Sequence, residues 1–151
     1  MRERPLLLFV ISVVVICGAC AARPPSKSKF LASFSAAEVI KRSYDQADAQ
    51  KQPTISSSES SSVLGSRRVY HRDDRADLVI SKSEEPLFLL RIKREIEEQL
   101  QKSGCKMFAG GSGDNNYAIE YTDGTVNGWI DIWGMRGAGD TYRVIIIITE
   151  N

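Results

Sequence analysis

The sequence predicts a small two-layer α+β domain, in which one main helix packs on a largely antiparallel sheet of about 4–5 strands. Apolar residues recur at helical spacing between residues 84 and 102, and after residue 105 they alternate with polar ones. Asp123 and Gly124 form a hairpin signal between two such alternating runs. We expect this domain to cover residues 67–151, after a signal or anchor segment (1–22) and a tether (23–66).

The N-terminal segment has the layout of a secretory signal. Arg2 and Arg4 precede the apolar stretch Leu6–Ile16, and small residues follow. That stretch of 11 residues is shorter than the roughly 20 that a membrane-spanning helix needs. The 17 uncharged residues of Leu6–Ala22 reach the lower end of that range, so an uncleaved single-pass anchor is the alternative.

Gly18 and Ala19 stand immediately before Cys20. This pattern resembles the bacterial lipoprotein export signal, in which small residues precede a cysteine that becomes the lipidated N-terminus. The resemblance implies lipid attachment at Cys20 and a location in the cell envelope, on a membrane and facing the periplasm or the exterior. An ordinary signal peptidase could instead cut after Ala21 and release a secreted protein.

The tether is expected to contain one short helix and one flexible linker. Ser35 and Glu38 have capping-box spacing, which predicts a helix over about residues 36–50. The stretch "TISSSESSSVLGS", Thr54–Ser66, offers little apolar area to bury, so we expect a serine-rich linker. Such a coil would reach roughly 20 Å and hold the domain off the membrane.

Within the domain, the apolar run Ala76–Ser81 predicts a short strand. The main helix is expected over Pro86–Lys102, with Gly104 as its stop. Its apolar stripe comprises Leu89, Ile92, Ile96 and Leu100.

Four further strands are predicted after this helix, over residues 105–109, 117–122, 125–133 and 142–149. The segment "GGSGDN", Gly110–Asn115, should turn the chain after the first of them. A two-residue turn at Asp123-Gly124 would place Tyr121 opposite Val126 and Ile119 opposite Gly128. One face of this hairpin is apolar and should pack on the main helix.

The other face of the hairpin is the candidate partner or ligand surface. It carries two indoles among polar side chains: Asn127, Trp129, Asp131 and Trp133. The last strand is apolar on both sides, so Ile145 and Ile147 need a cover of their own. The short helix, a second subunit or an envelope protein could supply that cover; left bare, the isoleucines would join the tryptophans in an interaction surface.

Candidate chemistry is sparse. The segment "HRDDRAD", His71–Asp77, gathers an imidazole and three carboxylates, so a ligand-binding or hydrolytic site there is the alternative function. Two arginines interrupt it, however, which is typical of a solvated segment, and we expect no catalytic residue, metal or cofactor. Nearly balanced charge, 20 basic and 19 acidic residues, argues against nucleic-acid binding. The sequence therefore favours a non-catalytic, membrane-tethered domain that binds an envelope protein or a second copy of itself.

Overall fold

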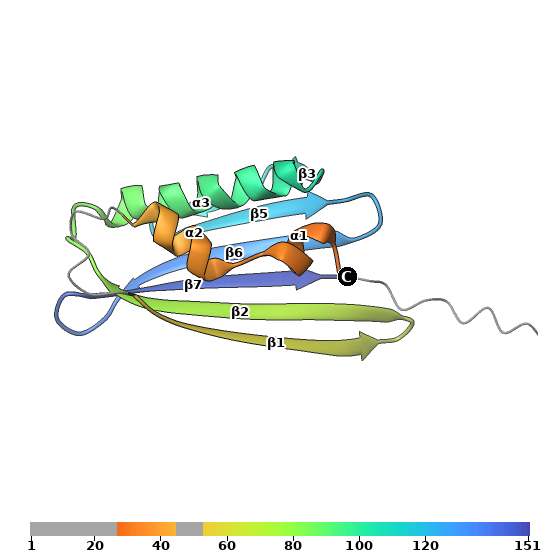
Figure 1. Ribbon diagram of the computed structural model, residues 1–151, viewed down its shortest axis with the longest axis horizontal. Helices are drawn as coiled ribbons and strands as arrows, with labels where there is room; N and C mark the ends of the chain where they lie inside the picture. Colours follow the sequence, from red (N-terminus) through yellow and green to blue (C-terminus); the bar gives the residue numbers. More distant parts are fainter. Residues whose placement is uncertain (1–26, 45–52) are drawn as a thin grey trace, which may run out of the picture.

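The computed structural model describes residues 27–44 and 53–151. The described chain forms a seven-stranded antiparallel sheet, in the order β1-β2-β7-β6-β5-β3, with β4 also paired to β5. Three helices lie on one face of this sheet (Figure 1). A small α+β domain with an antiparallel sheet is thus confirmed, although the sheet is larger than predicted.

The helices are α1 (Lys29–Ser33), α2 (Ala36–Ser43) and α3 (Glu85–Lys102). The strands are β1 (Thr54–Leu64), β2 (Arg67–Val79), β3 (Lys106–Phe108), β4 (Ser112–Gly113), β5 (Asn116–Thr122), β6 (Asn127–Arg136) and β7 (Thr141–Glu150). The predicted signal segment and Cys20 lie outside the described residues. None of the helices in the described part combines the length and the apolarity needed to cross a membrane.

Helix α3 agrees with the prediction. Pro86 stands in its first turn, where a missing backbone N–H costs nothing, and the helix ends at Lys102. Ile92, Ile96 and Leu100 are fully buried against the sheet, as the helical spacing of the apolar residues requires.

The serine-rich segment is a strand, which corrects the prediction of a flexible linker. Strand β1 pairs with β2 along its whole length, from Thr54 opposite Asp77 to Leu64 opposite Arg67. A strand at the edge of a sheet gains its order from the backbone ladder and can leave its side chains in water. Serine therefore suits it, and the linker prediction failed because it considered only the apolar area that the side chains could bury.

Helices α1 and α2 belong to the domain core rather than to a tether. Phe30, Leu31, Val39 and Ile40 are buried in the same hydrophobic cluster as the apolar residues of α3 and the sheet. The predicted helix over 36–50 is observed as α2, which ends at Ser43, and residues 45–52 are outside the description. Helix α1 was not predicted, because its five residues are too few to display a helical period.

The turn between β5 and β6 is longer than predicted. Asp123 Oδ1 accepts hydrogen bonds from the backbone N–H groups of Thr125 (2.9 Å) and Val126 (2.8 Å), which organises a four-residue turn. Ile119 consequently faces Ile130, and Tyr121 faces Gly128. The register differs from the predicted one by an even number of residues, so every side chain keeps its predicted face.

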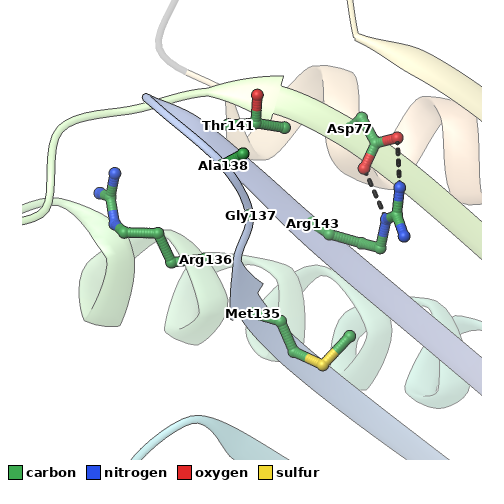
Figure 2. Close-up of a pocket in the computed structure, with 7 residues that line it drawn as sticks. All are labelled: Asp77, Met135, Arg136, Gly137, Ala138, Thr141 and Arg143. Atoms are coloured by element: carbon green, nitrogen blue, oxygen red, sulfur yellow. Dashed lines mark hydrogen bonds and ion pairs between the residues drawn. The ribbon is translucent and has the colours of Figure 1, made fainter.

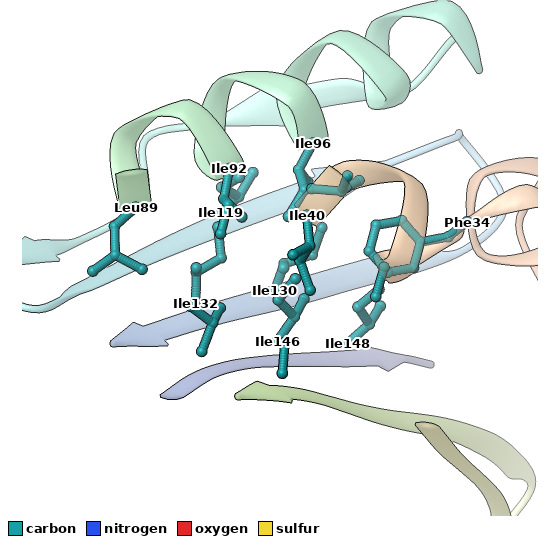
Figure 3. Close-up of a cluster of buried hydrophobic side chains, with 14 of the residues drawn as sticks. Phe34, Ile40, Leu89, Ile92, Ile96, Ile119, Ile130, Ile132, Ile146 and Ile148 are labelled. Atoms are coloured by element: carbon teal, nitrogen blue, oxygen red, sulfur yellow. The ribbon is translucent and has the colours of Figure 1, made fainter. Parts of the chain in front are cut away.

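The core lies between the helices and the inner face of the sheet. Figure 3 shows isoleucines of β5, β6 and β7 meeting side chains of α3 and of the N-terminal segment. The labelled residues are Phe34, Ile40, Leu89, Ile92, Ile96, Ile119, Ile130, Ile132, Ile146 and Ile148.

One buried carboxylate fastens the N-terminal segment to this core. Glu150, fully buried at the end of β7, accepts hydrogen bonds from the Ser28 N–H (3.0 Å), the Ser28 hydroxyl and the Tyr121 hydroxyl (2.5 Å). Ser28 also caps α1 by accepting from the Leu31 N–H at 3.0 Å. The position at which the chain enters the domain is therefore set by contacts with its last strand.

Candidate functional site

The outer face of the sheet, opposite the helices, carries all the residues predicted for the partner surface. Strict alternation places Asn127, Trp129, Asp131 and Trp133 of β6 on this face, together with Ile145 and Ile147 of β7. The strands run side by side, with Trp133 opposite Ile145 and Asp131 opposite Ile147. The structure thus brings the six predicted residues together.

No helix of the described part covers this face. Helix α2, which we considered as a cover for Ile145 and Ile147, lies on the opposite side of the sheet and packs against α3 (Figure 1). The reason is its own sequence: the buried residues Val39 and Ile40 join the inner core. Both tryptophans remain 42% exposed.

Two apolar residues that were not predicted extend the surface. Met135 of β6 (46% exposed) continues the alternation of the tryptophans, and Phe108 of β3 (52% exposed) stands opposite Glu120, whose side chain is also on the outer face. Met135 was missed because the predicted strand ended at Trp133. We call Trp129, Trp133, Met135, Ile145 and Ile147 the apolar strip.

Strand β2 borders the apolar strip with charged side chains that form ion pairs. Arg75 Nη2 lies 2.7 Å from Asp73 Oδ2, and Arg143 of β7 binds both oxygens of Asp77 at 2.7 and 2.9 Å. The hydrogen bond from each arginine lowers the pKa of its partner aspartate. The border is therefore polar, with its positive and negative groups already paired.

The geometry does not assemble a hydrolytic site from the segment His71–Asp77. The strand sends Asp73 and Asp77 to the outer face and Asp74 to the inner face, where Asp74 Oδ2 is 2.7 Å from Arg72 Nε. Asp73 and Asp77, whose pKa values are lowered by hydrogen bonds from Arg75 and Arg143, are poor general bases near neutral pH. Among the described residues, no group of His, Cys, Asp and Glu side chains is arranged to hold a metal.

A shallow pocket of about 400 Å³ lies at one end of the apolar strip, beside the turn between β6 and β7. Figure 2 shows the Asp77–Arg143 pair on one side of it and Gly137 and Ala138 in the turn that joins β6 to β7. Arg136 turns away to bind Glu85, with Nε 2.6 Å from Oε1. Since its charges are paired and Met135 joins it to the apolar strip, the pocket extends the candidate partner surface.

Cys105 is a core residue. The side chain is buried in the hydrophobic cluster, and burial raises the pKa of its thiol. A thiol that is harder to ionise is a weaker nucleophile, so Cys105 is not a candidate catalytic group.

Comparison with known proteins identifies no family. No family model matches the chain, and a search of curated proteins finds no match. Among solved structures, the chain is similar to CalU16 from Micromonospora echinospora, with 12% identity and a TM-score of 0.37 over 64% of this chain and 70% of that one. A similarity at this level carries no argument about function.

Proposed function

We propose that this chain is an exported, membrane-tethered protein of the cell envelope whose α+β domain binds a protein partner through the outer face of its sheet. The export signal and the attachment at Cys20 rest on the sequence pattern of residues 1–22. The observation that supports the interaction role is the uncovered apolar strip across β6 and β7.

The strip has the composition of a binding surface. Soluble domains rarely expose contiguous large apolar side chains without a use for them, and tryptophans are prominent among the residues that dominate binding energies. The ion pairs of β2 border the strip. Protein interfaces have the same arrangement, with an apolar core surrounded by a polar rim. The partner is either a second copy of the chain or another envelope protein.

The test uses two substitutions on the outer face and one control. Trp133→Ala removes an indole, and Ile147→Asp places a charge in the strip. Leu87→Ala removes an aliphatic residue that is more exposed than either (58%), from α3 on the other side of the sheet. Because none of these side chains is fully buried, each variant should fold, which circular dichroism would verify.

Association is measured by sedimentation velocity and by photo-crosslinking in native membranes, with a photoreactive phenylalanine analogue in place of Trp129. We expect Trp133→Ala and Ile147→Asp each to weaken association at least about tenfold and Leu87→Ala to leave it unchanged. A wild-type chain that is monomeric and forms no crosslink would contradict the proposal. So would association that survives both outer-face substitutions.

A further inference from the structure

The tip of the β1–β2 hairpin is an exposed apolar site outside the apolar strip. Val63 and Leu64 are 68% and 75% exposed, more than any other large hydrophobic side chain in the described residues. Gly65, with φ of +64°, supports the tight turn, and Arg67 and Arg68 follow after Ser66. We call residues 63–68 the hairpin tip.

The hairpin tip projects beyond the rest of the sheet. Strand β7 pairs with β2 only as far as Tyr70, which stands opposite Glu150, whereas β1 and β2 continue to pair up to Leu64 and Arg67. Three further residues of strand correspond to about 10 Å. Figure 1 shows the β1–β2 turn extending past the end of β7.

The charges of the hairpin tip are available to a ligand. Neither Arg67 nor Arg68 forms an ion pair with another residue of the described chain, in contrast to Arg72, Arg75 and Arg143. Two aliphatic side chains beside two unpaired arginines suit the interface of an anionic bilayer. There, aliphatic groups enter the acyl boundary and guanidinium groups bind lipid phosphates.

The chain enters the domain at the same end of the molecule. Lys27 Nζ lies 2.5 Å from Glu59 of β1 and 5.8 Å from the centroid of the Tyr70 ring, next to the Ser28–Glu150 contact. Glu59 is five residues from Leu64, so the hairpin tip lies about 17 Å along the strand from this entry point. The seven steps from Cys20 to Lys27 can span at most about 25 Å. A lipid at Cys20 would therefore keep the bilayer within reach of the hairpin tip.

We infer that the hairpin tip is a second membrane contact, specific for anionic lipid, which fixes the orientation of the tethered domain. This inference rests on the anchoring part of the proposed function. With the tip at the bilayer, β1 and β2 run toward the membrane. The outer face of the sheet then stands roughly perpendicular to the membrane surface. The apolar strip would then be open to a partner held in the same membrane.

The test reconstitutes the full chain into vesicles of phosphatidylcholine alone or of phosphatidylcholine mixed with phosphatidylglycerol. Leu64→Cys probes the hairpin tip, and Leu87→Cys provides a matched control because it is also well exposed (58%). Leu87 is in the first turn of α3, near the Arg136–Glu85 pair and the β6–β7 turn at the opposite end of the sheet. A water-soluble maleimide labels both variants, and peptide mass spectrometry measures labelling at each position.

We expect labelling of Leu64→Cys to be at least about tenfold slower in the anionic vesicles, as two arginines at an anionic surface predict. Leu87→Cys should react equally in both vesicles. Adding Arg67→Glu and Arg68→Glu to Leu64→Cys should restore fast labelling, which would separate lipid-phosphate binding from simple crowding by the membrane.

The two proposals fail in different ways. If the chain floats with the vesicles but Leu64→Cys reacts as fast in anionic vesicles as in neutral ones, the tip contact is overturned and the anchor stands. If the chain floats with neither vesicle, the anchor is overturned and the tip contact with it.

Discussion

The buried carboxylate of Glu150 offers the sharpest test of how this fold is held together. Glu150→Gln keeps the size of the side chain but leaves one oxygen and an NH₂ group facing three donors: the Ser28 N–H, the Ser28 hydroxyl and the Tyr121 hydroxyl. The amide group must therefore leave at least one of these donors without an acceptor. Hydrogen bonds to a charged group contribute about 1.5–3 kcal/mol each, and an unsatisfied buried donor adds a desolvation cost.

We expect Glu150→Gln to lower the free energy of unfolding by about 2–4 kcal/mol and Tyr121→Phe to lower it by about 1.5–3 kcal/mol. Because both variants remove the same contact, the double variant should lose about 1–2 kcal/mol less than the sum of the two. The measurement is urea unfolding followed by tryptophan fluorescence. Glu38→Gln, on an exposed carboxylate, is the control and should stay within about 0.5 kcal/mol of wild type.

Additive effects of the two substitutions would refute the direct contact between Glu150 and Tyr121. If Glu150→Gln were as stable as wild type to within about 0.5 kcal/mol, the reasoning that this carboxylate fastens the N-terminal segment would be wrong.

Three further predictions concern the core and the turn. Gly128→Ala should lower the free energy of unfolding by about 1–3 kcal/mol, since an added Cβ would lie 2.1 Å from the buried Tyr121 ring. Ile146→Ala, at a fully buried position, should lower it by about 2–5 kcal/mol. Burial acts to raise the pKa of Asp123, but hydrogen bonds from Thr125 and Val126 outweigh it and lower the pKa. The Asp123 carboxylate therefore stabilises the fold above its unfolded pKa of about 3.9, and this stabilisation is lost as the pH falls through its lower pKa in the folded state. We expect the free energy of unfolding of Asp123→Asn to decrease less steeply in acid than that of wild type.

Each of these predictions has a matched comparison in unfolding experiments. Gly111→Ala adds a methyl group with no atom within 4 Å and should be neutral, so equal effects at Gly111 and Gly128 would contradict the steric argument. Ile145→Ala, on the outer face, should cost less than half as much as Ile146→Ala; similar costs would mean that the outer face is also packed. For Asp123→Asn, a pH profile parallel to that of wild type would show that the Asp123 carboxylate does not contribute to acid sensitivity.

The helix and strands whose apolar residues recur with a clear period could be predicted from the sequence. Helix α3 and strands β5, β6 and β7 follow from the spacing of isoleucine, leucine and tryptophan. The period of these apolar residues identifies the type of element and also the face that it buries. The same alternation correctly assigned Trp129 and Trp133 to the face away from the helix. The alternation could not show whether another element covers that face, because this depends on the side of the sheet on which α2 packs.

The elements that were missed owe their order to long-range contacts. Strand β1 has little apolar content and depends on the ladder to β2 and on Glu59, which binds Lys27 and Arg72. Helix α1 depends on the contact between Ser28 and Glu150, which are 122 residues apart. The β5–β6 register is the exception, because it depends on a local contact in which the Asp123 carboxylate accepts two backbone N–H groups. Local propensity contains none of this information.

The position of β7 in the sheet bears on when the protein can fold. This strand is the last of the described strands along the chain, yet it lies between β2 and β6 and joins the two halves of the sheet (Figure 1). Until it has been synthesised, β1–β2 and β3–β6 are separate pieces, and Ser28 has no carboxylate to bind. Folding dominated by such distant pairings is slow. Because the core is complete only once β7 has been made, late folding of this kind would be compatible with the export that we propose.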